Sequence, residues 1–315
     1  AVLAGSHVDT VPHGGHFDGT LGVITALEVA QVWRETGFIP DRSLEIVVFS
    51  DEEGIRFNGG LTGSRIMMGE ADAERVREDK DEAGRSFAEV LKEDGLDIDR
   101  LDKAVRKPEE IHAFVELHIE QGRVLEEKGI PIGIVTSIAA PVRLWLDIKG
   151  RQDHSGATPM EMRKDALTFA SEVVLLVEKL GRAESHRKSV ATVGVLHLEP
   201  NAMNVVPGHV ELGIDIRGID LLSREEVVQG LVKGIEEISL TRDIEYVLKE
   251  ISREDPVSMD EEIISGLKHA ATFEGVRFLE MPSGAGHDAM VMASVTKAGM
   301  LFIPCRGGIS HNPQE

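Results

Sequence analysis

The stretch GSHVDTVPHGGHFDGTLGV, residues 5–23, decides how the rest of the chain is interpreted. Ala1 to Gly5 predicts a buried strand, and the apolar spacing from Gly19 to Trp33 predicts a helix. The glycine-rich loop between them holds five side chains that can bind metal ions: His7, Asp9, His13, His16 and Asp18. Open α/β sheets bind their ligands at such strand-to-helix loops, so this segment predicts an α/β fold with a site at the strand end.

Composition narrows the possible classes of protein. The 315 residues are enough for about two domains, and the formal net charge of −21 argues against binding of a phosphate backbone. Apolar runs such as LEIVVF are far shorter than a membrane span, so we expect neither a nucleic-acid nor a membrane partner. The single Cys305 excludes an intrachain disulfide and favours a reducing compartment, so we expect a cytoplasmic protein. The sequence starts inside a predicted strand and stops at SHNPQE, which indicates the middle of a longer protein.

The two ends of the chain together predict one α/β domain, residues 1–138 and 253–315. Leu44 to Ser50 is a continuous apolar run, which is typical of a strand covered on both faces of a sheet. Acidic residues follow this run directly. The charged segment 71–107 predicts mostly helix with some loop, and Phe114 to Ile119 predicts another strand.

The middle of the chain, residues 139–252, predicts a separate α+β domain inserted into the first. Its first helix is expected to begin with Thr158 as N-cap, Pro159 at the first position and Glu161 closing a capping box, and to end at Gly181. A second helix is expected over about 223–239, and strands over 142–149, 191–198, 209–217 and 244–251. The resulting order βαββαβ is that of a ferredoxin-like domain.

Four segments carry candidate metal ligands: His7 and Asp18 in the opening loop, DEEG at 51–54, HIEQG at 118–122, and GGISHNPQE at 307–315. Three of the four directly follow a predicted strand. Imidazole nitrogens and carboxylate oxygens suit Zn²⁺, Mn²⁺ or Co²⁺, and a carboxylate can bridge two such ions. Each residue alone could equally be a solvated loop residue. The four glycine-bounded clusters taken together favour a metal site.

Seven segments, in order along nearly the whole chain, resemble the hydantoinase/carbamoylase amidases, a branch of the di-metal aminoacylase and carboxypeptidase-like peptidase family. They are GSHVDTVPHGGHFDG, DEEGIRF, HIEQG, HSGATPM, NVVPG, SGAGHDA and GGISHNPQE. The resemblance implies a di-metal, exopeptidase-like α/β catalytic domain with an inserted lid or dimerisation domain, in agreement with the division made above. It further implies two divalent ions per subunit, Zn²⁺, Mn²⁺ or Co²⁺, and a homodimer formed through the inserted domain.

The resemblance also assigns the metal ligands. His7 and His118 would bind one ion, Glu53 and His311 would bind the other, and Asp18 would bridge both. The glycines of the opening loop would allow the tight turn that points His7 and Asp18 at the same ions.

Other residues near these ligands take implied roles as well. Glu52 would be the general base that acts on water, and Asp9 would orient the ring of His7 from outside the coordination sphere. His16 is expected to shape the loop, and His13 is expected to be an ordinary surface residue.

Five residues resemble the family's substrate contacts: Gln121, His154, Asn204, Arg217 and Gly286. Arg217 offers a planar fork for a substrate carboxylate, and His154 would take a catalytic role by stabilising the oxyanion. Asn204 can donate to and accept from an amide or ureido group, and Gly286 would bring backbone close to the substrate.

Each residue from the inserted domain also has a structural alternative. Arg217 could pair with Asp215 or Asp220, Asn204 could cap a turn before Pro207, and His154 could cap the following helix.

The implied reaction is hydrolysis of an N-carbamoyl-L-amino acid to the L-amino acid, CO₂ and ammonia. Allantoate, ureidoglycolate and β-ureidopropionate are alternative substrates within the family, and a peptidase or aminoacylase is an alternative in the wider clan. His118 within HIEQG favours the carbamoylase branch. A non-catalytic metal-binding homologue would predict a damaged metal set, whereas all five ligands and Glu52 are present. Cys305 is expected in the core or near the site and not as a nucleophile.

Overall fold

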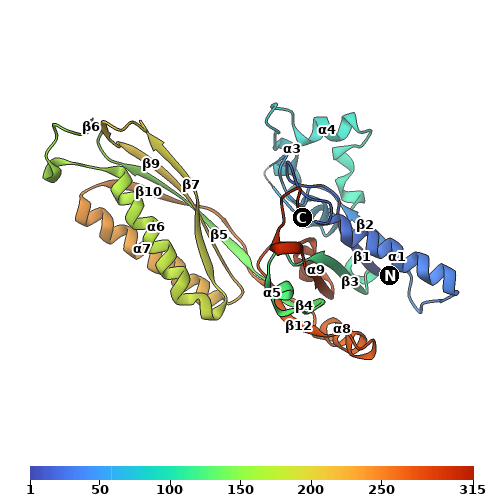
Figure 1. The fold of residues 1–315 in the computed structure, drawn as a ribbon. Helices are drawn as coiled ribbons and strands as arrows, with labels where there is room; N and C mark the ends of the chain where they lie inside the picture. Colours follow the sequence, from blue (N-terminus) through green and yellow to red (C-terminus); the bar gives the residue numbers. More distant parts are fainter. Residues whose placement is uncertain (58) are drawn as a thin grey trace. The chain divides into compact units, whose positions relative to one another are not determined.

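The computed structural model describes residues 1–57 and 59–315 and divides into two compact units (Figure 1). The first unit comprises Ala1–Ile138 and Val257–Glu315, and the second comprises Ala139–Pro256. The second unit therefore ends at Pro256, four residues beyond the expected boundary at residue 252. Strand β10, Glu245–Arg253, is longer than the sequence indicated and carries the second unit past residue 252.

The first unit is built on a seven-stranded sheet in the order β11-β4-β13-β3-β1-β2, with β12 paired to β4. Its strands are β1 Val2–His7, β2 Leu44–Phe49, β3 Ala113–Ile119, β4 Ile132–Ile138, β11 Val257–Ser258, β12 Phe278–Ser283 and β13 Ala298–Ile303. The neighbouring strands β2, β1, β3 and β13 are all parallel. Their carboxyl ends consequently meet at one edge of the sheet.

The helix expected from Gly19 to Trp33 is confirmed, whereas the segment 71–107 contains more loop than expected. The helices of the first unit are α1 Thr20–Thr36, α2 Thr62–Met67, α3 Ala73–Glu78, α4 Phe87–Glu93, α5 Val124–Lys128, α8 Glu261–Phe273 and α9 Asp288–Val295. Helix α1 buries Gly22, Val23 and Ala26. Its C-cap is Gly37, which adopts the left-handed conformation and donates its backbone N–H to the carbonyl of Trp33. The charged segment 71–107 contains α3, α4 and a short 3₁₀ helix at Ile98–Lys103.

Strand β2 differs from the expectation in its environment. Its apolar run predicted a strand covered on both faces, but β2 lies at the edge of the sheet. Val48 is half exposed there, and only Phe49 of this strand is fully buried. A continuous apolar run indicates a strand, but it does not determine the position of that strand in the sheet.

The second unit has the predicted order βαββαβ. Its four antiparallel strands are ordered β10-β5-β9-β7, and a short pair, β6 and β8, lies outside this sheet. The elements in chain order are β5 Ala140–Lys149, β6 Asp153–His154, α6 Ala166–Glu184, β7 Val190–Glu199, β8 Val205–Val206, β9 His209–Gly218, α7 Leu221–Arg242 and β10 Glu245–Arg253. This is the ferredoxin-like arrangement.

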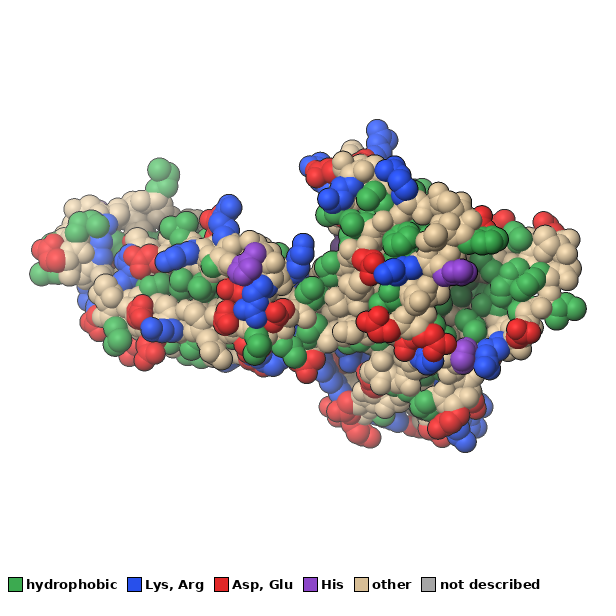
Figure 2. All heavy atoms as spheres, turned by 90° about the horizontal axis from the view of Figure 1, so that it is seen from below, with side chains coloured by type: hydrophobic (Ala, Val, Ile, Leu, Met, Phe, Trp, Pro, Cys, Tyr) green, Lys and Arg blue, Asp and Glu red, His purple; other side chains and the backbone are tan. Residues whose placement is uncertain are grey.

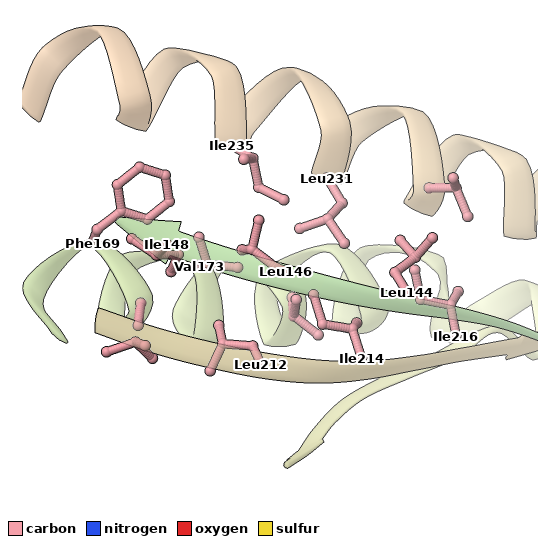
Figure 3. Packing of buried hydrophobic residues seen from close by; sticks show 14 of the residues in the cluster. Leu144, Leu146, Ile148, Phe169, Val173, Leu212, Ile214, Ile216, Leu231 and Ile235 are labelled. Atoms are coloured by element: carbon pink, nitrogen blue, oxygen red, sulfur yellow. The ribbon is translucent and has the colours of Figure 1, made fainter. Parts of the chain in front are cut away.

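One face of this sheet packs against both helices (Figure 3). Alternate residues of β5 and β9 point to the helices, among them Leu146 and Leu212, which are fully buried. Phe169 of α6 and Leu231 of α7 point from the helices toward these strand residues. The period of two in the strands and the apolar stripe of each helix thus close one core.

Helix α6 starts later than predicted. Asp165, not Thr158, is its N-cap, and its Oδ1 accepts the backbone N–H groups of Leu167 and Thr168 at 3.0 and 3.1 Å. The segment after Pro159 forms only a short 3₁₀ turn, Met160–Met162. The guanidinium of Arg163 donates to carbonyl oxygens before Pro159, which stabilises a turn where the capping pattern predicted a helix.

The other end of α6 also differs from the prediction. Gly181 does not end the helix, because it lies buried in the last turns of α6 against Ala191.

The surface carries charges of both signs. Figure 2 shows acidic and basic side chains interspersed over the face that it presents. Among the residues that the structure describes, no helix is both long and apolar enough to cross a membrane.

Candidate metal centre

Five predicted ligands converge at the carboxyl edge of the parallel strands in the first unit. His7 is the last residue of β1, Glu53 follows β2, His118 lies near the end of β3, and His311 follows β13. Asp18 precedes α1 in the loop that leaves β1. The parallel pairing of β2, β1, β3 and β13 brings these distant segments together.

The first group of ligand atoms surrounds one oxygen of Asp18. Oδ1 of Asp18 lies 3.4 Å from Nε2 of His7 and 3.2 Å from Nε2 of His118. All three side chains are buried. Two donors of a tetrahedral ion with bonds of roughly 2.0–2.1 Å lie about 3.3 Å apart, so this spacing fits a single Zn²⁺-sized ion.

The second group surrounds the other oxygen of the same carboxylate. Nε2 of His311 lies 3.6 Å from Oδ2 of Asp18 and 3.4 Å from Oε2 of Glu53. The remaining Glu53 oxygen, Oε1, is buried and has no hydrogen-bond partner in the described chain. Asp18 therefore offers one oxygen to each group, which is the arrangement of a carboxylate that bridges two ions.

Backbone carbonyls orient both buried rings. Nδ1 of His7 lies 2.9 Å from the carbonyl of Asp9, and Nδ1 of His118 lies 2.9 Å from the carbonyl of Ile119. A carbonyl only accepts, so each Nδ1 carries the proton and each Nε2 is left to face Asp18.

Asp9 orients His7 in a different way from the one expected. The Asp9 carboxylate is 3.9 Å from Nδ1 of His7, and it accepts the backbone N–H of Glu53 at 3.1 Å instead. Asp9 thus connects the first ligand loop to the DEEG segment.

At the centre, burial and contacts with neighbouring charged groups shift the pKa values in opposite directions. Burial alone would lower the pKa of His7, but the contact with Asp18 and the charges of Glu52 and Asp288 raise this pKa to about 10. Burial alone would raise the pKa of Asp18, but hydrogen bonds with His118 and His7 hold it well below its ordinary value. Cations that bind here must therefore displace protons from the imidazoles.

Glu52 lies beside the ligands and is nearly buried. Its Oε2 is 3.8 Å from Nε2 of His7, and 10% of its side chain is exposed. Burial raises the pKa of Glu52 well above its ordinary value, although the charge of His7 partly offsets this effect. A carboxyl group of this kind beside a metal set is suited to take and return a proton.

Gln121 and Ser310 both donate to the shared carboxylate. Nε2 of Gln121 lies 2.7 Å and Oγ of Ser310 lies 2.6 Å from Oδ2 of Asp18. Gln121 was predicted as a substrate contact and Ser310 was not predicted at all. Its position next to His311 in the sequence was the available signal.

Three residues at or next to the centre have a strained backbone. Asp51, Gln121 and His311 have φ angles of 59°, 56° and 58°, a left-handed conformation that is uncommon for residues other than glycine. Strain of this kind persists where the surrounding structure enforces it, which is typical of functional sites. Gly19, with φ of 64°, is required for another reason, because an added Cβ would lie 2.4 Å from the ring of His7.

Sequence reasoning missed three buried residues close to the centre: Glu116, His287 and Asp288. Glu116 accepts from Oγ of Ser6 at 2.6 Å and from the backbone N–H of Ala289 at 2.9 Å. The ring of His287 lies 4.6 Å from that of His118, between centroids. His287 and Asp288 belong to the motif SGAGHDA, from which only Gly286 was selected.

Asp288 is fully buried, and neither of its carboxylate oxygens has a hydrogen-bond partner in the described chain. Burial and the nearby charge of Glu116 raise the pKa of Asp288 to about 8. Burial, with the charge of His118, lowers the pKa of His287 well below its ordinary value.

Three of the predicted substrate residues belong to the second unit. Nδ1 of His154 accepts the backbone N–H groups of Gly156 and Ala157, so this ring stabilises a turn and not a helix. The backbone carbonyl of Asn204 accepts the backbone N–H of Ser155, which places Asn204 near His154. Nε of Arg217 donates to Asp215 at 2.8 Å, as the structural alternative expected.

The remaining expectations concern the first unit. Gly286 lies in the loop before α9, with open space where a side chain would project. Cys305 is buried, and its Sγ lies 3.5 Å from the carbonyl of Gly122 in the HIEQG segment. His13 and His16 are exposed.

Comparisons with known proteins show the family of this chain. The model of peptidase family M20/M25/M40 matches residues 3–315. The N-carbamoyl-L-amino acid amidohydrolase of Geobacillus stearothermophilus is 40% identical over 314 residues, which cover 100% of this chain and 76% of that protein. Allantoate deiminase 1 of Glycine max is 39% identical over 344 residues, which cover 100% of this chain and 71% of that protein.

Solved structures lead to the same family. A hydantoinase/carbamoylase family amidase from Burkholderia multivorans superimposes with a TM-score of 0.89 at 35% identity, over 99% of this chain and 75% of that one. The match to the family model spans almost every residue, and the relatives cover the chain from end to end. This chain therefore belongs to peptidase family M20/M25/M40, and its relatives include the hydantoinase/carbamoylase amidases.

Proposed function

We propose that this protein hydrolyses the ureido C–N bond of an N-carbamoyl-L-amino acid at a centre of two divalent cations. The coarser statement, that the chain is a hydrolase of non-peptide C–N bonds, follows from its family and its relatives. The observation that carries the finer proposal is the shared carboxylate of Asp18, with one group of nitrogen and oxygen ligands on each oxygen.

The residues of the centre would share the work as follows. His7, His118, Asp18, Glu53 and His311 would hold the two cations. Cations bound there would supply Lewis acidity to the ureido carbonyl and to the attacking water.

Glu52 would take a proton from that water on its carboxylate and return it to the leaving nitrogen of the substrate. Cleavage of this C–N bond releases the amino acid and carbamate, and carbamate decays to CO₂ and ammonia.

The second unit would supply the substrate contacts. Arg217 would bind the substrate carboxylate, Asn204 the ureido group, and His154 the developing oxyanion. In the first unit, Gln121 and Gly286 would also contact the substrate. The proximity of His154 to Asn204 within the second unit supports a common role for these two residues.

Three further parts of the proposal concern the whole protein. The cations are Zn²⁺, Mn²⁺ or Co²⁺, because histidine and carboxylate donors accept all three. Two chains form a homodimer through the second unit, and the protein acts in the cytoplasm. The resemblance to the family supports the dimer, and the single cysteine supports a reducing compartment.

The test is ammonia release from a panel of N-carbamoyl-L-amino acids, allantoate and N-acetyl amino acids. The full chain is stripped of metal and resupplied with each cation, and Glu52→Gln is compared with Glu28→Gln, a change on the exposed face of α1. We expect metal-dependent release from carbamoyl substrates that is lost only in Glu52→Gln. Release from allantoate alone would change the substrate, in line with the allantoate deiminase relative. Two bound ions without any turnover would refute the carbamoylase assignment.

A further inference from the structure

The loop that carries Asp18 has little regular structure of its own. Residues 8–19 lie between β1 and α1, and they form only a few short-range backbone hydrogen bonds, such as Gly14 N–H to the Val11 carbonyl at 2.9 Å. Asp18 is nevertheless the most constrained carboxylate of the centre, since both of its oxygens face ligand groups. The position of its backbone must therefore be fixed from outside the loop.

Glu315 contacts this backbone from outside the loop. Its Oε1 accepts the backbone N–H of Phe17 at 2.7 Å and the backbone N–H of Asp18 at 2.8 Å. Hydrogen bonds to an ionised acceptor are shorter and roughly twice as strong as neutral ones. The two bonds join segments 298 and 297 positions apart in the chain.

The position of Glu315 is itself fixed relative to another ligand. The backbone N–H of Glu315 donates to the carbonyl of Asn312 at 3.0 Å, and the N–H of Gln314 donates to Oδ1 of Asn312 at 3.0 Å. This turn begins directly after His311. One short segment thus holds both a ligand of the second group and the acceptor that fixes the backbone of Asp18.

Gly15 provides independent evidence that this contact is close-packed. A Cβ added to Gly15 would lie 2.4 Å from Cβ and 2.5 Å from Cδ of Glu315. No real side chain approaches so closely. The closer contact is with Cβ of Glu315, which is bonded to the main chain and cannot move away by a side-chain rotation. The second glycine of PHGGHFDG is therefore required for the loop to lie against Glu315.

We propose that Glu315 is a positioning residue of the metal centre, which holds the Asp18 backbone in register with His311 by accepting two N–H groups. This inference rests on the proposed di-metal centre. Glu315 acts through Asp18, so its removal should loosen the ions and lower kcat, while KM should change little. Changes to residues that support metal ligands typically weaken metal affinity by about 10–100-fold.

The experiment compares Glu315→Ala, Glu315→Gln and the control Glu28→Ala in the full chain. Glu28→Ala removes the same charge from the exposed face of α1. Co²⁺ affinity is measured by competition with a chelator, and the visible Co²⁺ spectrum reports the coordination geometry. We expect Glu315→Ala to bind Co²⁺ about 10–100-fold more weakly with a shifted spectrum. Glu315→Gln keeps one acceptor oxygen and should recover most of the affinity.

A second variant tests the same contact from the opposite side. Gly15→Ala should weaken Co²⁺ binding by displacing Glu315, and the double variant Gly15→Ala/Glu315→Ala should lose less than the sum of the two single losses. Additive losses would mean that the two residues act independently, and they would overturn the proposal.

Three other results would also count against it. Unchanged affinity and spectrum in Glu315→Ala would show that the contact does not position Asp18. A folded Glu315→Gln variant as weak as Glu315→Ala would show that the acceptor is not the cause. A wild-type chain that binds no Co²⁺ would refute the metal centre itself, which distinguishes failure of the proposed function from failure of the positioning role.

Discussion

Replacing Gly19 by alanine tests how tightly the first metal group is packed. The added Cβ would lie 2.4 Å from the ring of His7, whereas ordinary contacts begin at 3.4 Å, so the ring must move by about 1 Å. Misplacement of a reacting group by about 1 Å can cost on the order of 10²-fold in rate. The backbone of Gly19, with φ of 64° and ψ of −54°, is sparsely populated by other residues and adds a penalty of about 1–3 kcal/mol for any residue with a Cβ.

Gly37→Ala is a matched control at the other end of the same helix. Gly37 is left-handed, with φ of 70°, but a Cβ there meets nothing within 4 Å. Gly37→Ala should therefore lose stability in thermal unfolding through its backbone conformation alone, whereas Gly19→Ala should lose more because its Cβ also displaces the His7 ring. Only Gly19→Ala should lose metal affinity and about 10²-fold in kcat/KM. Equal metal affinity and activity in the two folded variants would refute the packing argument.

Three further outcomes follow from the site and the core. Glu52→Gln should bind both ions normally yet lose about 10²–10⁴-fold in kcat, which metal analysis and steady-state kinetics would check together. The pKa of His7 in the metal-free protein is raised from 6.5 to about 10, so His7 is protonated near pH 8. Binding of Zn²⁺ at pH 8 should therefore release a proton, and the affinity for Zn²⁺ should increase as pH rises toward 10. The same proton stabilises the metal-free fold fully below about pH 6.5, and this contribution is lost as pH rises through about 10. Calorimetry in two buffers of different ionisation enthalpy measures the release, and identical heats would contradict it. Leu146→Ala should destabilise the second unit by about 2–5 kcal/mol in urea, whereas Val190→Ala, at an exposed position, should cost much less.

The convergence of the candidate metal ligands was predictable because each lies in a short segment with a strong local signal. His7 and His118 end or nearly end apolar strands. Glu53 lies next to Gly54, and His311 follows shortly after the pair Gly307 and Gly308. Local sequence was sufficient there, because parallel strands bring their carboxyl ends to the same edge.

The roles of Asp288 and Glu315 were not predictable by the same reasoning. Asp288 becomes a buried acid only because distant strands cover it, and no pattern around residue 288 reports that burial. Glu315 carries no local sign that it accepts from Phe17 and Asp18. Such roles depend on contacts between segments far apart in sequence, whereas periodicity and capping patterns describe neighbours.

The start of α6 shows a conflict between local and non-local signals. Thr158 and Pro159 form a good helix start by themselves, but Arg163 binds carbonyls on the other side of the proline. Asp165 then provides an equally good cap about two helical turns later. When two caps compete, side-chain contacts outside the pattern decide between them.

The connection between the two units has a consequence for the order of folding. The second unit leaves the first after Ile138 and returns at Val257, and these two residues are paired neighbours on β4 and β11. Closing that pair around an unfolded stretch of about 120 residues costs about 3 kcal/mol more than closing a four-residue turn.

A folded second unit removes most of that entropic penalty. The backbone N–H of Glu254 donates to the carbonyl of Pro141 at 3.1 Å, so the unit holds its own two ends together. We therefore expect β5 and β9 to gain protection in pulsed hydrogen exchange before the β4–β11 pair does, and the reverse order would contradict this. A folded ferredoxin-like unit would thus promote formation of the larger sheet, because it returns β11, β12 and β13 to β3 and β4, which precede the unit in the chain.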